Sequence, residues 1–530
     1  MILSLGSQKN KKMRFTYVFL LVLMVNLAHA QITQPARYEL EEKQAANSPL
    51  LISMRENGLA LLQDKDKIKD RKNLWELVLL DTALQEKYKK EVALDSKLKL
   101  VGYDFINTDL YYLFREGDTN FNNLILLKIN IDNHQETTYT IKQQVEFKLS
   151  HFSMLHDAAI FGGYVSNEPA VILYDVEKDN LKILPGFFLT DNELLDLRVN
   201  KNNTFNVLLV DRGNKENKKI VLRTYDSQGT QLLEDIIDIP KGKTIISGIT
   251  SALERDELII IGAWGVEKSK LASGLFTLMA DPFEAQSIQF YGYGELKHSF
   301  DFMNPKRAEK IKSRESTNQK SERKPNYKNP LHIVKMEETK KGFTLLAEMY
   351  SAYSTSLPAS NPYSPYSSSF YYAPQSFFSP YSNRYSNGPF PNYGNRPNGE
   401  QVFHTLVVEF DARGNLINDY GLPLENIKLL SLDQVSDFVS IPNGIAQVYK
   451  KESDLIFNIN EPNELSTQDT VKIQPKNPTD KVKFESNEDG GIRSWYRNIL
   501  YTWGYCTIKS AEKSVDPSRN VFYINKIRVE

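Results

Sequence analysis

Short runs of apolar residues recur along the chain, and turn-forming or charged residues separate them. The stretch from Lys243 to Tyr291 shows this pattern most plainly. Its apolar runs are Thr244–Gly248, Glu257–Gly262, Gly274–Met279 and Gln286–Phe290. Apolar runs of this length between turn signals predict β-strands, and four of them in succession predict one antiparallel four-stranded sheet.

The third strand of this unit ends where an apolar run meets Asp or Asn, and the same ending recurs along the chain. The eight ends are Asp81, Asp132, Asp175, Asp226, Asp281, Asp411, Asn460 and Asn525. Successive ends lie 43 to 65 residues apart, except that 130 residues separate Asp281 from Asp411. Repeats of about 40 to 50 residues with four strands are typical of β-propellers, because a single blade cannot bury both faces of its sheet. We therefore predict an all-β propeller of eight four-stranded blades, with seven blades as the alternative.

The last repeat has no fourth strand, because the chain stops just after Val529. Near the other end of the chain, Tyr38–Glu42 alternates polar and apolar residues as a half-exposed strand does. An unpaired sheet edge is a liability in a closed ring. We therefore predict that Tyr38–Glu42 is the outer strand of the last blade and that residues 31–530 form a single propeller domain.

The N-terminus has the features of an export signal. Basic residues from Lys9 to Arg14 precede the apolar run Phe15–Leu27, and Ala28-His-Ala30 follows. This order predicts a signal peptide over residues 1–30 and a mature chain that starts at Gln31. The apolar run is shorter than the roughly 20 residues that span a bilayer, and no later run approaches that length. The residue directly after the predicted cleavage site is Gln31 and not Cys, so we expect a periplasmic or secreted protein that is not a lipoprotein.

The composition of the chain argues against several kinds of partner and site. The chain of 530 residues has 65 basic and 66 acidic side chains, a balance that argues against a nucleic-acid partner. Its single cysteine, Cys506, excludes an intramolecular disulfide and is expected to be buried in a strand beside Trp503. His151, His156 and Asp157 could be ligands, but they flank a predicted turn where polar residues are ordinary. No phosphate-binding loop or nucleophile motif is present, so we predict no metal, no cofactor and no catalytic residues.

Two insertions account for the long interval before Asp411. Residues 303–329 are rich in Lys and Arg and are predicted to be disordered. Residues 353–399 form a low-complexity tract rich in Tyr, Ser, Pro and Asn. The first insertion enters the sixth blade, and the second joins that blade's second and third strands. Because strands alternate in direction, both insertions should leave the same rim of the ring.

Aromatic residues at this rim are the candidate binding residues. Trp264 and Trp503 end predicted second strands, with Tyr505 close to Trp503. They could stack on sugars or a peptide, or each Trp could pack between blades with its indole N–H on a backbone carbonyl. The tract adds Tyr363, Tyr366, Tyr371, Tyr372, Tyr381 and Arg384. It is either a recognition loop, in which Tyr supplies contact area, or an expansion without a partner.

The chain resembles secreted bacterial β-propellers in architecture only. It has no Trp-Asp strand ends, no paired glycines of the kelch kind and no Ser-x-Asp-x-Gly-x-Thr-Trp box. We predict a non-catalytic protein that binds a protein or a cell-envelope glycan through the insertions on one face. The alternative is a glycan-processing hydrolase or lyase with carboxylates at the mouth of the central channel.

Overall fold

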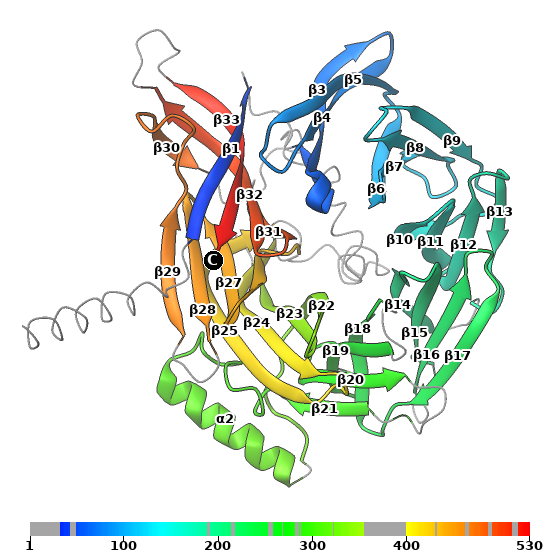
Figure 1. The fold of residues 1–530 in the computed structure, drawn as a ribbon. Coiled ribbons are helices and arrows are strands. Elements are labelled where there is room, and N and C mark those ends of the chain that lie inside the picture. The colour runs from blue at the N-terminus through cyan, green and yellow to red at the C-terminus, as the bar shows by residue number, and fades with distance from the viewer. Residues whose placement is uncertain are drawn as a thin grey trace, which may run out of the picture.

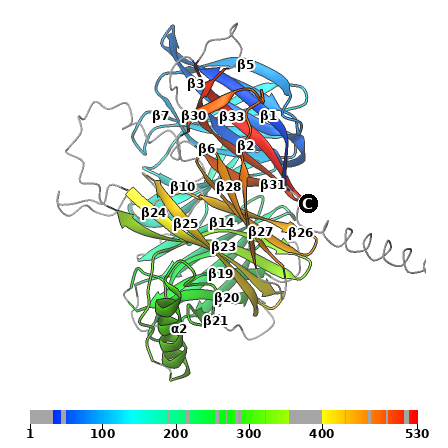
Figure 2. The same ribbon diagram turned by 90° about the vertical axis from the view of Figure 1, so that its left-hand side faces the viewer.

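Eight antiparallel sheets stand in a ring (Figure 1), so the predicted eight-bladed β-propeller is confirmed. The computed structural model describes residues 32–42, 49–187, 191–213, 218–252, 258–267, 269–280, 286, 288–321, 323–353, 399–429, 432–461, 466–485, 490–510 and 518–530. Figure 2 shows the same ring turned by 90°.

The first four blades follow one another along the chain, each with its strands in sequence order. Blade one consists of β2 (Leu50–Ser53), β3 (Leu59–Lys69), β4 (Lys72–Leu80) and β5 (Glu86–Asp95), with a short 3₁₀ turn, η1 (Arg55–Asn57), after β2. Blade two consists of β6 (Leu98–Ile106), β7 (Asp109–Glu116), β8 (Leu124–Asn130) and β9 (Glu136–Ile141). Blade three consists of β10 (Lys148–Leu155), β11 (Ala158–Val165), β12 (Glu168–Asp175) and β13 (Asn180–Ile183). Blade four consists of β14 (Asn192–Val199), β15 (Thr204–Asp211), β16 (Lys219–Asp226) and β17 (Gln231–Asp238).

The second half of the ring contains the irregular blades six and eight. Blade five consists of β18 (Lys243–Thr250), β19 (Leu258–Val266), β20 (Gly274–Ala280) and β21 (Ile288–Gly292). Blade six consists of β22 (Leu331–Thr339), β23 (Gly342–Tyr353), β24 (Gly399–Asp411) and β25 (Leu416–Leu429), and helix α2 (Pro305–Lys320) precedes it. Blade seven consists of β26 (Ser436–Ile441), β27 (Gly444–Lys451), β28 (Asp454–Asn460) and β29 (Thr467–Lys472). Blade eight consists of β31 (Gly491–Tyr496), β32 (Ile499–Lys509), β33 (Arg519–Val529) and β1 (Ile32–Glu42), and a short strand, β30 (Lys481–Glu485), pairs with the end of β32.

Asp side chains at the ends of third strands close the hairpins to the outer strands. The carboxylate of Asp81 accepts the backbone N–H groups two and four residues ahead, both at 2.9 Å. Asp226 and Asp411 accept the equivalent pairs at 2.7 to 2.9 Å. This side-chain turn is the physical reason for Asp at these three positions, and the predicted end Asp281 lies outside the described residues. In blade two, Asn130 makes the turn in place of the predicted Asp132.

The N-terminal strand closes the ring, as predicted. β1 pairs antiparallel with β33 from Ile32 opposite Val529 to Glu42 opposite Asn520, so it is longer than Tyr38–Glu42. Asn525 lies inside β33 and does not end it, so its assignment as a strand end was wrong. The reason is that pairing with β1 continues the third strand of blade eight to Val529.

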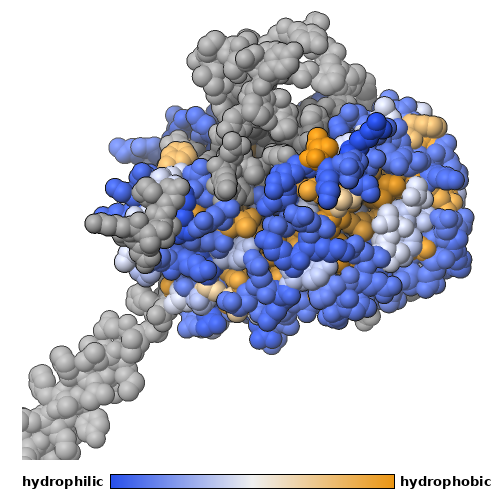
Figure 3. Space-filling model, turned by 90° about the horizontal axis from the view of Figure 1, so that it is seen from above, coloured by the Kyte–Doolittle hydropathy of each residue, from blue (hydrophilic) through white to orange (hydrophobic). Residues whose placement is uncertain are grey.

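Both faces of each blade are covered by neighbouring blades, and this explains the continuous apolar runs. All nine residues of β19 are buried. An alternating pattern is typical of a sheet with one face in water, whereas a fully covered strand is apolar throughout. The outer strands are more polar, and the side of the molecule in Figure 3 is mainly hydrophilic. Cys506 is buried on β32, as predicted.

The basic segment is ordered over helix α2, whereas the sequence predicted disorder there. Asn304 caps the helix by accepting the N–H of Lys306 at 3.1 Å, and Pro305 occupies the first turn. The buried carboxylate of Glu315 accepts the N–H groups of Asn326 and Tyr327 at 3.1 to 3.2 Å. These tertiary contacts offset the repulsion between the basic side chains. Among the described residues, no helix is both long and apolar enough to cross a membrane.

Candidate functional site: the insertion face of blade six

We call residues 293–330 together with the adjoining ends of β23 and β24 the insertion face. The C-terminal end of this segment is fixed to two blades. Asn329 exchanges backbone hydrogen bonds of 2.9 and 3.0 Å with Ala272 in blade five. The side chain of Asn329 donates to the carbonyl of Tyr350 on β23 at 3.4 Å. The segment therefore adjoins β23, the strand that precedes the Tyr-rich tract of residues 353–399, called the aromatic tract below.

The N-terminal part of the segment packs on the strand that resumes after the tract. The ring of Phe302 lies 4.7 Å from that of Phe403 and 5.2 Å from that of His404, both near the start of β24. His404 is fully buried, and its Nε2 donates to the carbonyl of His298 at 2.8 Å. Burial lowers the pKa of His404 to about 4, so the ring is neutral near pH 7. The described ends of both insertions thus lie together, as the alternation of strand direction predicted.

A short ionic contact holds the loop before α2. His298 Nδ1 lies 2.7 Å from a carboxylate oxygen of Asp301, and this hydrogen bond raises the pKa of His298 above its ordinary value. The buried carboxylate of Asp419 on β25 accepts the N–H groups of Lys297 and His298 at 2.9 and 2.7 Å. The loop is therefore attached to the outer strand of blade six as well as to β24.

Helix α2 carries a polar pocket of about 580 Å³. Its lining residues are Lys310, Ser313, Arg314, Thr317, Asn318, Arg323, Lys324 and Asn326. Within the described ranges, none of the four basic side chains in this lining makes an ion pair. Sequence reasoning found the basic run but missed the helix that gathers it. The Asn304-Pro305 start and the spacing of Lys310, Arg314 and Thr317 were the available signals.

Trp264 is placed for packing. Its indole is 5% exposed, and its N–H donates to the carbonyl of Tyr291 at 3.2 Å. The ring of Phe290 meets it edge-on at 5.4 Å, and Lys243 Nζ lies 4.3 Å from its centroid. Of the two interpretations of Trp264, this geometry matches the packing one.

Trp503 and Tyr505 lie on β32 in blade eight, away from Trp264 in blade five. Trp503 is half-buried and stacks on Tyr501 with centroids 5.5 Å apart, and the guanidinium carbon of Arg493 lies 5.4 Å from its ring. Tyr505 packs against Phe522 at 5.1 Å. The structure does not bring these residues to the insertion face. Tyr363, Tyr366, Tyr371, Tyr372, Tyr381 and Arg384 lie outside the described residues.

Acidic residues of the innermost strands bind the backbone of the next blade. Asp104 accepts the N–H of Met154 at 2.8 Å, and burial raises the pKa of its carboxyl to about 6. The carboxylates of Asp196 and Asp437 accept backbone N–H groups of blades five and eight, both at 2.7 Å. These carboxylates hold neighbouring blades together. In the described part of the chain, no three His, Cys, Asp or Glu side chains gather as a metal site.

The known structures that resemble this chain do so at low identity and low TM-score. The chain matches no protein-family model and no curated protein. Among solved structures, it is similar to the polysaccharide lyase Uly1 at 8% identity and a TM-score of 0.37, over 92% of this chain and 100% of that one. It is also similar to the β-propeller domain of the Trilobed protease from Pyrococcus furiosus, at 9% identity and a TM-score of 0.31, over 80% and 97%. A eukaryotic initiation factor shows 11% identity and a TM-score of 0.36, over 91% and 98%. At these identities and scores, the similarities do not indicate a function.

Proposed function

We propose that this protein is a non-catalytic β-propeller scaffold that binds a protein or a cell-envelope glycan through the insertion face of blade six. One observation carries the proposal: the basic segment packs on both strands that flank the aromatic tract, through Phe302 to Phe403 and Asn329 to Tyr350. The described ends of two insertions that a ring does not need for closure therefore lie on one face. Binding residues commonly lie on loops that a rigid scaffold holds in position. The basic, apolar and Ala-His-Ala order of the N-terminal sequence supports export, so we propose that the protein acts in the periplasm or outside the cell.

Excision of the tract tests the proposal. We expect the variant that lacks Leu357–Gly399, rejoined by a short turn, to lose the partner that the full mature chain retains from envelope extracts of its own cells. Protein and glycan fractions are assayed separately, so that the partner class is measured. The matched control changes Leu232 and Ile236 to Gln on the outer strand of blade four, where both side chains are exposed. Equal recovery by the excised and full chains would contradict the proposal.

The same variant reports on folding. Closing a loop that does not pack on the ring has an entropic cost of about (3/2)RT ln n, so shortening such a loop from about 45 residues to about 4 recovers on the order of 2 kcal/mol. Denaturant unfolding of the excised chain should therefore show a midpoint that is unchanged or higher. A large fall in the midpoint would show that the tract packs on the ring, and loss of binding would then report misfolding.

A further inference from the structure

We infer that the pocket on α2 binds the acidic groups of an anionic glycan, with Lys310, Arg314, Arg323 and Lys324 as the cationic contacts. This inference rests on the proposed function, because it names the ligand chemistry of the insertion face. Lys310, Arg314 and Thr317 are spaced four and three residues apart, so they lie along one side of the helix. Arg323 and Lys324 follow the helix, and the N–H of Arg323 bonds to the carbonyl of Asn318 at 2.7 Å. The chain thus folds back and adds two more cations to the pocket.

The helix dipole does not account for these charges. A cation stabilises a helix C-terminus only within the last turn, and Lys320 occupies that position in α2. Lys310 and Arg314 lie farther back along the helix. Glu315, the acidic residue next to Arg314, instead accepts the backbone N–H groups of Asn326 and Tyr327. The pocket therefore keeps positive charge that the described fold does not use.

Asn318 supplies a second, independent observation. Its side chain is 9% exposed in the pocket wall, and its amide nitrogen has no hydrogen-bond partner among the described residues. A buried donor without a partner is unfavourable, and most such groups in proteins are paired. The nitrogen itself is buried, so an oxygen atom of a ligand in the pocket would supply the missing acceptor once the Asn318 amide rotates toward the pocket.

The lining favours a glycan over a protein or a nucleic acid. It consists of four cationic side chains and four hydroxyl or amide side chains, with no apolar or aromatic residue. Protein interfaces are anchored by buried aromatic and apolar side chains, and sites for single-stranded nucleic acids stack bases on aromatic rings. Hydroxyl and amide groups instead match the hydroxyls of sugars, and Arg binds carboxylate or sulfate groups with two parallel hydrogen bonds.

Binding of defined polymers to the full mature chain tests the inference. The probes are heparin, which carries sulfate and carboxylate, and polygalacturonate, which carries carboxylate alone; neutral dextran, poly-glutamate and duplex DNA are the comparison ligands. We expect binding of at least one acidic glycan and none of dextran. Lys310→Gln with Arg314→Gln should weaken that binding at least about tenfold, the effect of losing one charge-assisted contact. Asn318→Asp should weaken it as well, because it places an anion in the pocket wall.

The matched control removes two charges from the same helix outside the pocket, by Lys306→Gln with Lys320→Gln. We expect it to weaken binding less than about threefold, as loss of general attraction does. Equal losses for the two double variants would overturn the pocket as the binding site, and tighter binding of poly-glutamate or DNA would overturn the glycan assignment.

The tract-excised chain separates the two proposals. If the excised chain still binds the probes and still captures the partner, the proposed function alone is contradicted. If no probe binds the full chain and the Lys310→Gln with Arg314→Gln variant still captures the partner, this inference alone is contradicted.

Discussion

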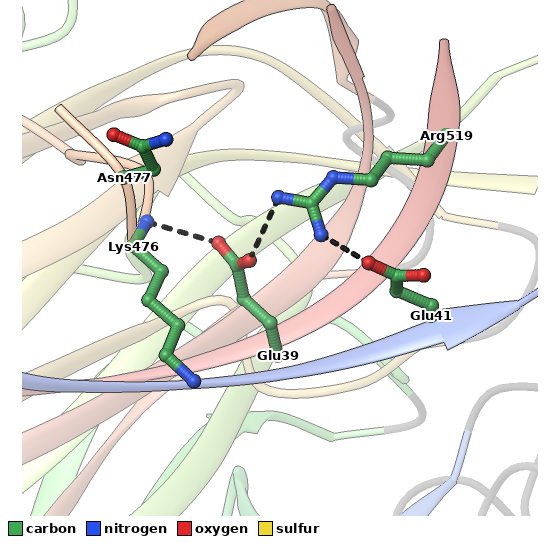
Figure 4. A pocket seen from close by; sticks show the side chains of 5 residues that line it. All are labelled: Glu39, Glu41, Lys476, Asn477 and Arg519. Carbon is green, nitrogen blue, oxygen red and sulfur yellow. Dashed lines mark hydrogen bonds and ion pairs between the residues drawn. The ribbon is translucent and has the colours of Figure 1, made fainter. Parts of the chain in front are cut away.

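Around Arg519, at the seam where β1 closes blade eight, charged side chains are paired, whereas the cations around α2 lack ionic partners in the described chain. Arg519 lies 3.5 Å from Glu39 and also contacts Glu41 (Figure 4). It lies 2.8 Å from Asp480 as well. The backbone N–H of Lys476 donates to Glu39 at 3.0 Å. One guanidinium therefore links the N-terminal strand, the C-terminal strand and the segment after blade seven.

The seam continues into the interior. Lys450 Nζ lies 2.6 Å from Glu485, and these side chains are only 3% and 2% exposed. The hydroxyl of Tyr523 donates to the same carboxylate, and the guanidinium of Arg37 lies 4.1 Å from the Tyr523 ring. Charges removed from water must be paired, whereas cations at a surface are solvated at little cost. Charge at the seam therefore fixes closure of the ring, whereas charge on α2 is available to a ligand.

Removal of β1 should have the largest effect. A chain that starts at residue 46 loses every partner of β33 on its outer side and the buried ring of Tyr38. We expect a cost on the order of 5 kcal/mol and, for a chain of this length, a thermal midpoint roughly 5 °C lower. The control chain starts at Gln31. An unchanged midpoint would show that the seam does not hold the ring.

The buried ion pair should have the next largest effect. Lys450→Met leaves the carboxylate of Glu485 without its partner, and we expect it to destabilise the protein by about 3 to 5 kcal/mol in denaturant unfolding. Glu485→Gln should cost a similar amount. The double variant should cost less than the sum of the two, because it leaves no charge uncompensated. Additive losses would mean that the pair is not coupled.

The His298 contact on the insertion face should contribute less, and only at low pH. The pKa of His298 is raised in the folded state by Asp301, although nearby Lys312 opposes the shift. Its contribution is therefore complete below the unfolded pKa of about 6.5 and is lost as pH rises through the folded pKa. The pair is partly exposed, so we expect His298→Gln to cost under about 1 kcal/mol at pH 5 and nothing at pH 8.5. A cost that is independent of pH would assign the effect to packing.

Neutralising the α2 pocket should have the smallest effect on stability. Lys310→Gln with Arg314→Gln removes two cations that have no described ionic partner, so we expect the free energy of unfolding to change by less than about 0.5 kcal/mol. A loss comparable to that of Lys450→Met would remove the contrast between the two regions, since the pocket would then be part of the folding machinery.

The features that depend on local hydrogen bonding and burial could be predicted from the sequence. The Asp81 turn is made within five residues, so it repeats visibly along the chain. Continuous apolar strands followed from the covered faces of each blade, and the missing fourth strand after Val529 predicted closure by β1. The site was foreseen only as a rim with two insertions, because strand direction alone places them.

The order of the basic segment and the surroundings of each tryptophan depend on contacts between residues that are distant in the sequence. Helix α2 is ordered by contacts to residues that are distant in the sequence. The loop before the helix bonds to Asp419, and Phe302 packs on Phe403. The basic run alone predicted repulsion, since no local pattern reveals these partners. The strand continues past Asn525 because β1, from the other end of the chain, pairs with β33 there. Trp264 and Trp503 occupy similar places in their repeats, yet different neighbouring blades surround them. Which side chains line a pocket depends on such long-range packing, and local sequence patterns do not report it.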